Sequence, residues 1–489
     1  MKNDWFKLML TGMAIFIMRI TVLAHTTGDG GYEIKIHINE FSKDSIFLGY
    51  HMGNQTYIRD TAVLDKKTGF FTFKKEKKLE SGVYLVVMPP DNNYFQIMVD
   101  ETEQHFTVTT STVDYYAEGK FKGSKDNDLF YNYMRFIATK RKEAEAISLK
   151  RSTDSSGTMK KLDALDTEVK NYQWDLVKKN PSSVTAVLIK SAIEVDIPKL
   201  ENIKDKNENE IARYLMYKQH FFDNFDMSNP ALLRTPVLYP RIDAYMEKMT
   251  PQHPDSIVES LDRILLLMKP NKEAFQFYFV HYLNKYAQSK LVGYDAIYVN
   301  LAKKYIATGL TDDFIQKDNK EKILQNADKL FPILIGKKAP EIRVFQKDSS
   351  LIGISDIKSK YTVLFFFEPT CGHCQKQSPF LVEFLQKAKE KKIDVKVMAI
   401  CTFVGPDKMP ECWKYVQEKG FGDFINAVDP YLISRYKSLY NIETTPQIYI
   451  LDEQKIIRSK SIEAKQIGEV LDHIIQEDNE KLKKQLKSH

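Results

Sequence analysis

Apolar and polar residues alternate along the first part of the chain. Between residues 32 and 38 every second residue is apolar. This period of two is typical of a β-strand with one buried face. Further strands are predicted at Ser45–His51, Gly69–Lys74, Gly82–Met88, Phe95–Val99 and Gln104–Thr109. Short strands at this spacing, with turn residues between them, predict an all-β sandwich or barrel over residues 25–122.

A different period follows. From Asp126 to about Phe331 apolar residues recur about every 3.6 positions, which predicts helices. The clearest are Leu162–Val177, Val184–Ile193, Glu210–Phe222, Ile257–Leu267, Ala274–Leu283 and Tyr294–Ile306. Ser152–Gly157 is expected to be a flexible loop. The aromatic clusters Phe221–Phe225 and Phe275–Phe279 favour a helical core over a groove for a client protein. Residues 123–331 are therefore predicted to form an all-α domain.

The last part, residues 332–489, mixes the two patterns. Tyr361–Phe367 is an unbroken apolar run with aromatic and β-branched members, which predicts a buried central strand. Further strands and helices are expected at Val395–Cys401, Phe424–Val428, Gln447–Leu451, Phe380–Lys391, Pro410–Lys419, Leu432–Tyr440 and Ile467–Gln476. Such alternation predicts an α/β domain with a largely parallel sheet.

The first 24 residues have the pattern of a secretory signal. Lys2 and Lys7 precede the apolar run Leu8–Leu23, and Ala24 fits the small residue required before a cleavage site. A retained membrane anchor is the alternative, although Arg19 interrupts the run. No cysteine follows the run, which argues against lipid attachment. We therefore expect an exported protein of the bacterial envelope or periplasm, attached to the membrane if the signal is retained.

Composition narrows the class of protein. A chain of 489 residues with 43% hydrophobic residues exceeds one ordinary core, so about three domains are expected. The net charge of +6 is small for this length and gives no reason to expect nucleic acid as a partner. There are 4 cysteines, all between positions 371 and 412, whereas a disulfide scaffold would spread more of them along the chain. The cysteines therefore indicate chemistry at one place.

The central motif is Cys371-Gly372-His373-Cys374. It follows the predicted strand Tyr361–Phe367 through a short turn and precedes a helical segment. Cys371 would then lie at a helix N-terminus, where backbone N–H groups and the helix dipole stabilise a thiolate. Cys374 is placed to attack a mixed disulfide formed at Cys371. The motif predicts a redox-active pair for thiol–disulfide exchange.

These residues carry a family resemblance. The segment from about residue 330 to 476 resembles the thioredoxin superfamily, and within it the TlpA/ResA-like envelope thioredoxins. The matching features are the strand, Cys371–Cys374 and helix, then Pro379, Thr445-Pro446 before a strand, and the opening Gly336–Pro340. The resemblance implies a thioredoxin fold in which a cis-proline loop, Thr445 and Pro446, binds the substrate chain. It also implies that Cys371 attacks and Cys374 resolves.

The sequence departs from this family at two positions. Thr370 stands where tryptophan is common before the first cysteine, and Phe365 stands where thioredoxins carry a buried acid. Another group must then manage the proton of Cys374, and Glu368 and Glu411 are the candidates. Gly372 and His373 are expected to tune the redox potential. A histidine here resembles isomerase and DsbA-type centres, but it does not decide between reductase and oxidase.

Cys401 and Cys412 form the second candidate pair. Cys401 ends a predicted strand and Cys412 begins a predicted helix, so a second disulfide, redox or structural, is one interpretation. Two buried thiols that pack as small apolar groups are the other. The spacing does not favour a zinc site, and no cofactor motif is present. No metal and no cofactor are therefore predicted.

The sequence as a whole predicts a three-domain envelope thiol–disulfide oxidoreductase. Its β and helical regions, with Asp65–Phe73 and His220–Asp226, resemble domains fused to such thioredoxins. The expected partners are disulfide-containing client proteins and a membrane or periplasmic thiol protein that exchanges electrons. The alternative is an envelope binding or scaffold protein whose thioredoxin-like domain is mainly structural.

Overall fold

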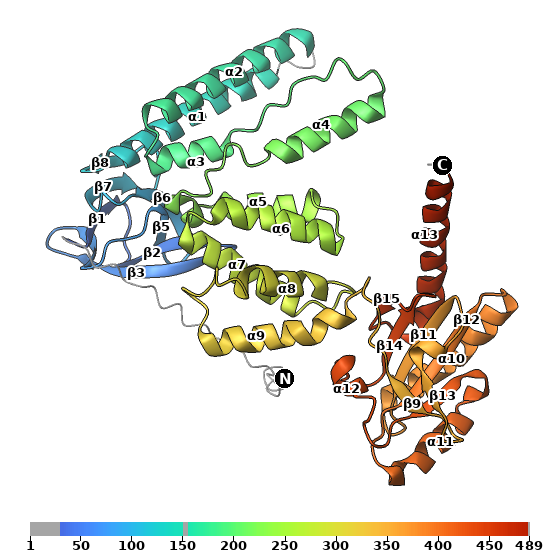
Figure 1. Ribbon diagram of the computed structural model, residues 1–489. Coiled ribbons are helices and arrows are strands. Elements are labelled where there is room, and N and C mark those ends of the chain that lie inside the picture. Colours follow the sequence, from blue (N-terminus) through green and yellow to red (C-terminus); the bar gives the residue numbers. More distant parts are fainter. Residues whose placement is uncertain (1–29, 150–154, 488–489) are drawn as a thin grey trace, which may run out of the picture. The chain divides into compact units, whose positions relative to one another are not determined.

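The structure is a computed structural model that describes residues 30–149 and 155–487. It has a β-rich N-terminal part, a helical middle part and a C-terminal part that mixes strands and helices (Figure 1). This three-part division confirms the predicted succession of fold classes. The predicted signal at residues 1–24 lies outside the described residues. Within the described ranges, no helix is long and apolar enough to cross a membrane.

Eight strands form the N-terminal sheet. They are β1 (Tyr32–Asn39), β2 (Ser45–Met52), β3 (Gln55–Asp65), β4 (Phe70–Lys75), β5 (Gly82–Met88), β6 (Asn93–Val99), β7 (His105–Ser111) and β8 (Lys120–Lys122). Their order is β6-β5-β2-β3-β4-β1-β7-β8, with each strand hydrogen-bonded to the next. The buried faces of β1 to β7 share one apolar core, so the sheet curves around it.

Strand β3 was not predicted from the sequence. Its burial explains the omission, because only Ala62 of this strand is buried and the polar run 59–61 interrupts the alternation. Strand β6 lies at one edge of the sheet, where helix α1 (Lys125–Ser148) covers it. Asn127 of α1 accepts a hydrogen bond from the Met98 N–H at 2.8 Å and donates one to the Met98 carbonyl at 2.7 Å. The asparagine side chain thus bonds β6 as a neighbouring strand would.

The middle part is helical, as predicted. Its further helices are α2 (Ser155–Lys179), α3 (Val184–Ala192), α4 (Lys206–His220), α5 (Leu238–Lys248), α6 (Pro254–Met268), α7 (Lys272–Ala287), α8 (Asp295–Leu301) and α9 (Lys317–Leu330). The expected loop at Ser152–Gly157 is wrong in its second half, because α2 begins at Ser155; its first half lies outside the described residues. The phenylalanines of both predicted aromatic clusters are buried, apart from Phe277, which confirms a core rather than a groove.

The C-terminal part holds a seven-stranded sheet flanked by helices. Its elements are β9 (Arg343–Phe345), β10 (Leu351–Gly353), β11 (Tyr361–Phe367), α10 (Gly372–Glu390), β12 (Val395–Cys401), α11 (Met409–Glu418), β13 (Ile425–Val428), α12 (Tyr436–Leu439), β14 (Gln447–Leu451), β15 (Ile457–Lys460) and α13 (Ile467–Lys487). Every residue of β11 is buried, which confirms the predicted central strand.

The strand order in this sheet is β10-β9-β13-β12-β11-β14-β15. Strands β11, β12 and β13 are parallel, but β14, β15, β9 and β10 join antiparallel. The prediction of a largely parallel sheet is therefore wrong. The link from β14 to β15 is too short for the crossover that a parallel pair requires. Alternate residues of β11 enter two cores, one beneath α10, α11 and α13 and one on the opposite face.

Candidate active site

Strand β11 leads directly to the first cysteine of the motif. A short turn follows Phe367, and it is closed by the Cys371 N–H, which donates to the Glu368 carbonyl at 3.1 Å. Cys371 is then the N-cap residue of α10. Its backbone is extended, and the helix begins at Gly372. The sulfur therefore lies where free backbone N–H groups and the helix dipole favour a negative charge.

Two backbone groups contact the sulfur of Cys371. The Cys374 N–H donates to Cys371 Sγ at 3.2 Å, as an N-cap side chain requires. The Cys371 thiol in turn donates to the Thr445 carbonyl oxygen at 3.2 Å. The peptide bond between Thr445 and Pro446 is cis. The structure thus places the predicted proline loop against the cysteine pair, although 74 positions separate the bonded residues Cys371 and Thr445.

The two cysteines are free thiols with opposite environments. Partial burial of Cys371 disfavours its thiolate, but hydrogen bonds from the Cys374 thiol and backbone N–H outweigh this and hold the pKa of Cys371 below its usual value. Cys374 is fully buried, and burial, followed by its hydrogen bond to Cys371, raises its pKa to about 12. Cys371 is thus the better nucleophile, and Cys374 needs a partner that removes its proton.

Gly372 and His373 occupy the first turn of α10, between the two cysteines, and both are exposed. A side chain at either position reaches solvent rather than the core. The imidazole of His373 is therefore available beside the thiolate, but solvent screens its charge. The tuning role of Gly372 and His373 stays a prediction.

The position of the missing acid is filled by aromatic side chains. Phe365 is completely buried, and its ring stacks on Phe367 with centroids 5.5 Å apart. Phe367 in turn stacks on Tyr415 of α11 at 5.0 Å. The Tyr415 hydroxyl lies 2.8 Å from Ser378 Oγ, and Ser378 donates to the Cys374 carbonyl at 2.9 Å. The buried hydroxyls of Tyr415 and Ser378 therefore lie beside the backbone of Cys374, on the core side of α10.

Of the two predicted acids, Glu411 lies at the surface and Glu368 lies in the turn before Cys371. Glu411 belongs to α11, but its side chain is 49% exposed and lies 3.6 Å from Lys408 Nζ. Glu368 accepts a hydrogen bond from Thr370 Oγ1 at 2.9 Å, in the turn before Cys371. Sequence reasoning missed Ser378 and Tyr415. Ser378 had a signal, because it lies one helical turn beyond Cys374, whereas the position of Tyr415 depends on a long-range contact.

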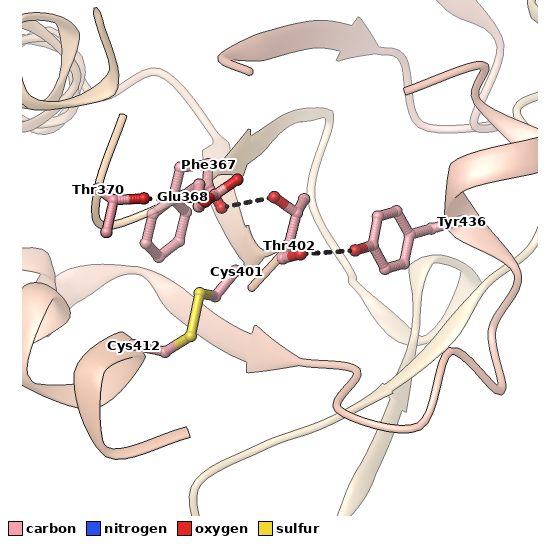
Figure 2. Close-up of a disulfide and its surroundings, with 7 residues drawn as sticks. All are labelled: Phe367, Glu368, Thr370, Cys401, Thr402, Cys412 and Tyr436. Atoms are coloured by element: carbon pink, nitrogen blue, oxygen red, sulfur yellow. Dashed lines mark hydrogen bonds between the residues drawn. A yellow bond between two sulfur atoms is a disulfide. The ribbon is translucent and has the colours of Figure 1, made fainter. Parts of the chain in front are cut away.

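Cys401 and Cys412 form a disulfide in the structure (Figure 2). Cys401 is the last residue of β12, and Cys412 lies in the first turns of α11. The exposed fractions of these residues are 2% and 0%, so the bond is enclosed in the core beneath α10 and α11. The second pair is therefore inaccessible to a bulky client disulfide.

Residues 335–460 match the AhpC/TSA family. With the fold and the cysteine motif described above, this match decides the assignment. The C-terminal domain belongs to the thioredoxin superfamily. Two other matches lie in the N-terminal and middle parts of the chain. Residues 32–130 match a domain of unknown function, DUF4369, and residues 158–329 match another, DUF5106.

Curated relatives resemble a short stretch of the thioredoxin-like domain. The thiol–disulfide oxidoreductase ResA of Bacillus thuringiensis (strain Al Hakam) is 34% identical over 61 residues, which are 12% of this chain and 35% of that protein. The ResA protein of Bacillus anthracis matches to the same extent. The chain therefore spans about a third of the length of the curated relatives it matches. The predicted resemblance to TlpA/ResA-like thioredoxins is confirmed.

Solved structures resemble the chain as well. A domain of a possible thiol–disulfide isomerase from Cytophaga hutchinsonii ATCC 33406 is 30% identical, with a TM-score of 0.27, and the match covers 31% of this chain and 97% of that one. A thioredoxin-like protein from Bacteroides caccae ATCC 43185 is 16% identical, with a TM-score of 0.42, and the match covers 57% of this chain and 99% of that one.

Proposed function

We propose that this chain is a thiol–disulfide oxidoreductase that works through Cys371 and Cys374. The observation that supports this most directly is the contrast between the two thiols. One is partly exposed at a helix N-terminus with its pKa lowered, and the other is buried with its pKa raised to about 12. An attacking and a resolving cysteine need these different properties.

The reaction proceeds in two exchanges. The Cys371 thiolate attacks one sulfur of a client disulfide, forms a mixed disulfide and releases the other client sulfur as a thiolate. Cys374 then loses its proton and attacks Cys371 Sγ. The bond between Cys371 and the client breaks, the client leaves as a dithiol, and the Cys371–Cys374 disulfide remains. The same steps in reverse oxidise a client, so the direction depends on the electron partner.

The loop at Thr445 and Pro446 is the proposed substrate-binding element. The Thr445 carbonyl already lies 3.2 Å from Cys371 Sγ, so a substrate chain beside this loop would have its sulfur next to the attacking thiolate. Proximity of this kind contributes to rate because it fixes the reacting atoms in place. Gly372 and His373 are proposed to tune the redox potential from the exposed turn.

Reduction of insulin disulfides with dithiothreitol as reductant tests the activity. We expect the intact chain to accelerate precipitation of the insulin B chain, and Cys371→Ser to abolish the acceleration. Cys401→Ala with Cys412→Ala is the comparison variant. It removes two cysteines away from the exposed turn and should keep far more of the acceleration than Cys371→Ser does. Equal rates for the intact chain and Cys371→Ser would favour the alternative, a binding or scaffold protein with a structural thioredoxin-like domain.

We further propose that the protein acts in the bacterial envelope. The charged and apolar pattern of residues 1–24 supports export, followed by domains at 25–122, 123–331 and 332–489. Its partners would be disulfide-containing proteins and a membrane or periplasmic thiol protein that renews the Cys371–Cys374 pair. Thiol trapping in cells tests the direction of electron flow. A mostly reduced pair indicates a reductase, and a mostly oxidised pair indicates an oxidase.

A further inference from the structure

The buried disulfide is joined to the turn that carries Cys371. Thr402 follows Cys401, and its N–H and Oγ1 donate to the Phe367 carbonyl at 2.8 and 3.1 Å. Phe367 is the last residue of β11, immediately before the turn at Glu368 (Figure 2). On the other side, the Tyr436 hydroxyl donates to the Thr402 carbonyl at 3.1 Å. Hydrogen bonds from Thr402, the neighbour of Cys401, therefore fix the end of β11 just before the turn that carries Cys371.

The other end of the disulfide is joined to Cys374. Cys412 and Tyr415 are three positions apart on α11, so they lie on one face of the helix. Ser378 Oγ donates its only hydrogen to the Cys374 carbonyl at 2.9 Å. The Tyr415 hydroxyl, 2.8 Å from Ser378 Oγ, must then be the donor in that bond. A directed chain of hydrogen bonds thus runs from Tyr415 through Ser378 to Cys374.

These contacts are buried in the core. Cys412 and Ser378 are fully buried, and Tyr415 is 4% exposed. The Tyr415 ring also contacts Phe367. The contacts that start at Cys401 and those that start at Cys412 therefore meet beneath the cysteine motif. In such an environment a hydrogen bond is stronger than in water, and an unpaired hydroxyl is costly. The arrangement therefore restricts movement of the helical turn that carries Cys374.

We propose that the Cys401–Cys412 disulfide, Tyr415 and Ser378 form a brace that positions Cys374 for its attack on the mixed disulfide at Cys371. The inference rests on the proposed function and deepens it. In the step concerned, a bond forms between Cys374 Sγ and Cys371 Sγ, the bond from Cys371 to the client sulfur breaks, and the client thiolate leaves. Tyr415 and Ser378 are positioning residues, because they act on Cys374 through its backbone.

The test separates attack from resolution. The full chain, with Cys371–Cys374 reduced and Cys401–Cys412 intact as verified by mass spectrometry, is mixed with dithiobis(nitrobenzoate). The first coloured thiolate is released by Cys371, and the second is released when Cys374 resolves the mixed disulfide. We expect Tyr415→Phe to slow the second phase about fivefold, the effect of one lost hydrogen bond, and to leave the first phase unchanged. The pH profile of the second phase should change, whereas that of the first should not.

A coupling experiment tests the role of the disulfide. Cys401→Ala with Cys412→Ala should also slow the second phase, and adding Tyr415→Phe to it should slow that phase little further, because both act through one brace. Ser378→Ala tests the same chain from α10, without changing α11. Tyr440→Phe is the matched control. That hydroxyl donates to the Pro340 carbonyl at 2.6 Å and belongs to the core on the other face of the sheet.

Three outcomes overturn the brace. They are an unchanged second phase in folded Tyr415→Phe, an equal slowing of both phases, and additive effects in the coupling experiment. If the disulfide variant does not fold, Tyr415→Phe and Ser378→Ala decide the question. The reagent reports thiol chemistry whether or not the chain acts on proteins, so a failed insulin assay overturns the proposed function without deciding the brace.

Discussion

The two cysteine pairs lie in one domain, beside the carboxyl ends of neighbouring parallel strands, yet they differ in redox form and in the exposure of their first cysteine. Cys371 follows β11, is partly exposed and is a free thiol. Cys401 ends β12 and is enclosed in a disulfide with Cys412. Sequence spacing alone does not produce this difference. It arises because the sulfur of Cys371 caps a helix at the surface, whereas Cys374, Cys401 and Cys412 belong to the core.

The largest expected effect is on insulin reduction, which should depend on Cys371 far more than on the Cys401–Cys412 pair. Cys371→Ser removes the thiolate, and we expect insulin reduction to fall by on the order of a thousandfold or more. Cys374→Ser should instead accumulate the mixed disulfide, which mass spectrometry detects as a covalent adduct. Loss of activity in the Cys401→Ala, Cys412→Ala protein comparable to that of Cys371→Ser would remove the distinction between the pairs.

The next effect is on the free energy of unfolding, to which the two cysteine pairs should contribute differently. The Cys401–Cys412 bond joins residues 11 positions apart, and closing a loop of this length contributes about 3 kcal/mol. Replacing both residues with alanine should lower the free energy of unfolding by roughly this amount, read from the urea midpoint and slope. Oxidation of Cys371 and Cys374 should change stability less. A larger effect from that pair would reverse the assignment of structural and reactive disulfide.

A pH experiment compares the two thiols of the motif. Alkylation requires the thiolate, and the pKa of Cys371 is lowered by hydrogen bonds from Cys374 that outweigh partial burial. Its alkylation rate should therefore persist below the ordinary thiol pKa of about 8.5 and fall as the pH drops through the lowered value. Cys374, with a pKa of about 12, should remain unmodified in the folded protein near neutral pH. Mass spectrometry after iodoacetamide treatment distinguishes the two sites.

The smallest expected effect concerns His373. Its imidazole is exposed, so its influence on the thiolate of Cys371 is screened by solvent. We expect His373→Ala to change the equilibrium constant with glutathione by about two- to fivefold, toward a more reducing protein. Lys376 is an exposed cation one turn further along α10. If Lys376→Ala changes the equilibrium constant with glutathione by the same factor, the effect belongs to general charge rather than to His373.

The sequence was informative where local pattern determines structure. The apolar run Tyr361–Phe367 and the motif after it predicted β11 and the start of α10, because a buried strand and a helix N-terminus both have local signals. Strand β3 has almost no buried face, so its alternation was invisible. The sheet direction was mispredicted, because the pairing of β9 and β14 depends on contacts between distant residues.

The site shows the same division. Cys371, Cys374 and the Thr445–Pro446 loop could be named from spacing and resemblance. Tyr415 could not, because its role depends on the path of α11 across the sheet and on the disulfide at Cys412. Glu411, on the same helix, was one of two acids named on chemical grounds, and the structure places its side chain on the exposed surface. Residue type alone could suggest an acid near Cys374, whereas only packing showed the buried hydroxyls of Tyr415 and Ser378 beside its backbone.

The N-cap of α10 links folding to oxidation. In most helices the cap is an oxygen whose strength is constant, but here it is the sulfur of Cys371, which accepts the Cys374 N–H. A thiolate is a stronger acceptor than a sulfur held in a disulfide, so the first turn of the helix is best capped when the pair is reduced. By a thermodynamic cycle, whatever the cap adds to the stability of the reduced fold also makes the oxidised protein a stronger oxidant. The difference in melting temperature between the two redox forms would therefore report how much the N-cap contributes to the oxidising strength of the protein.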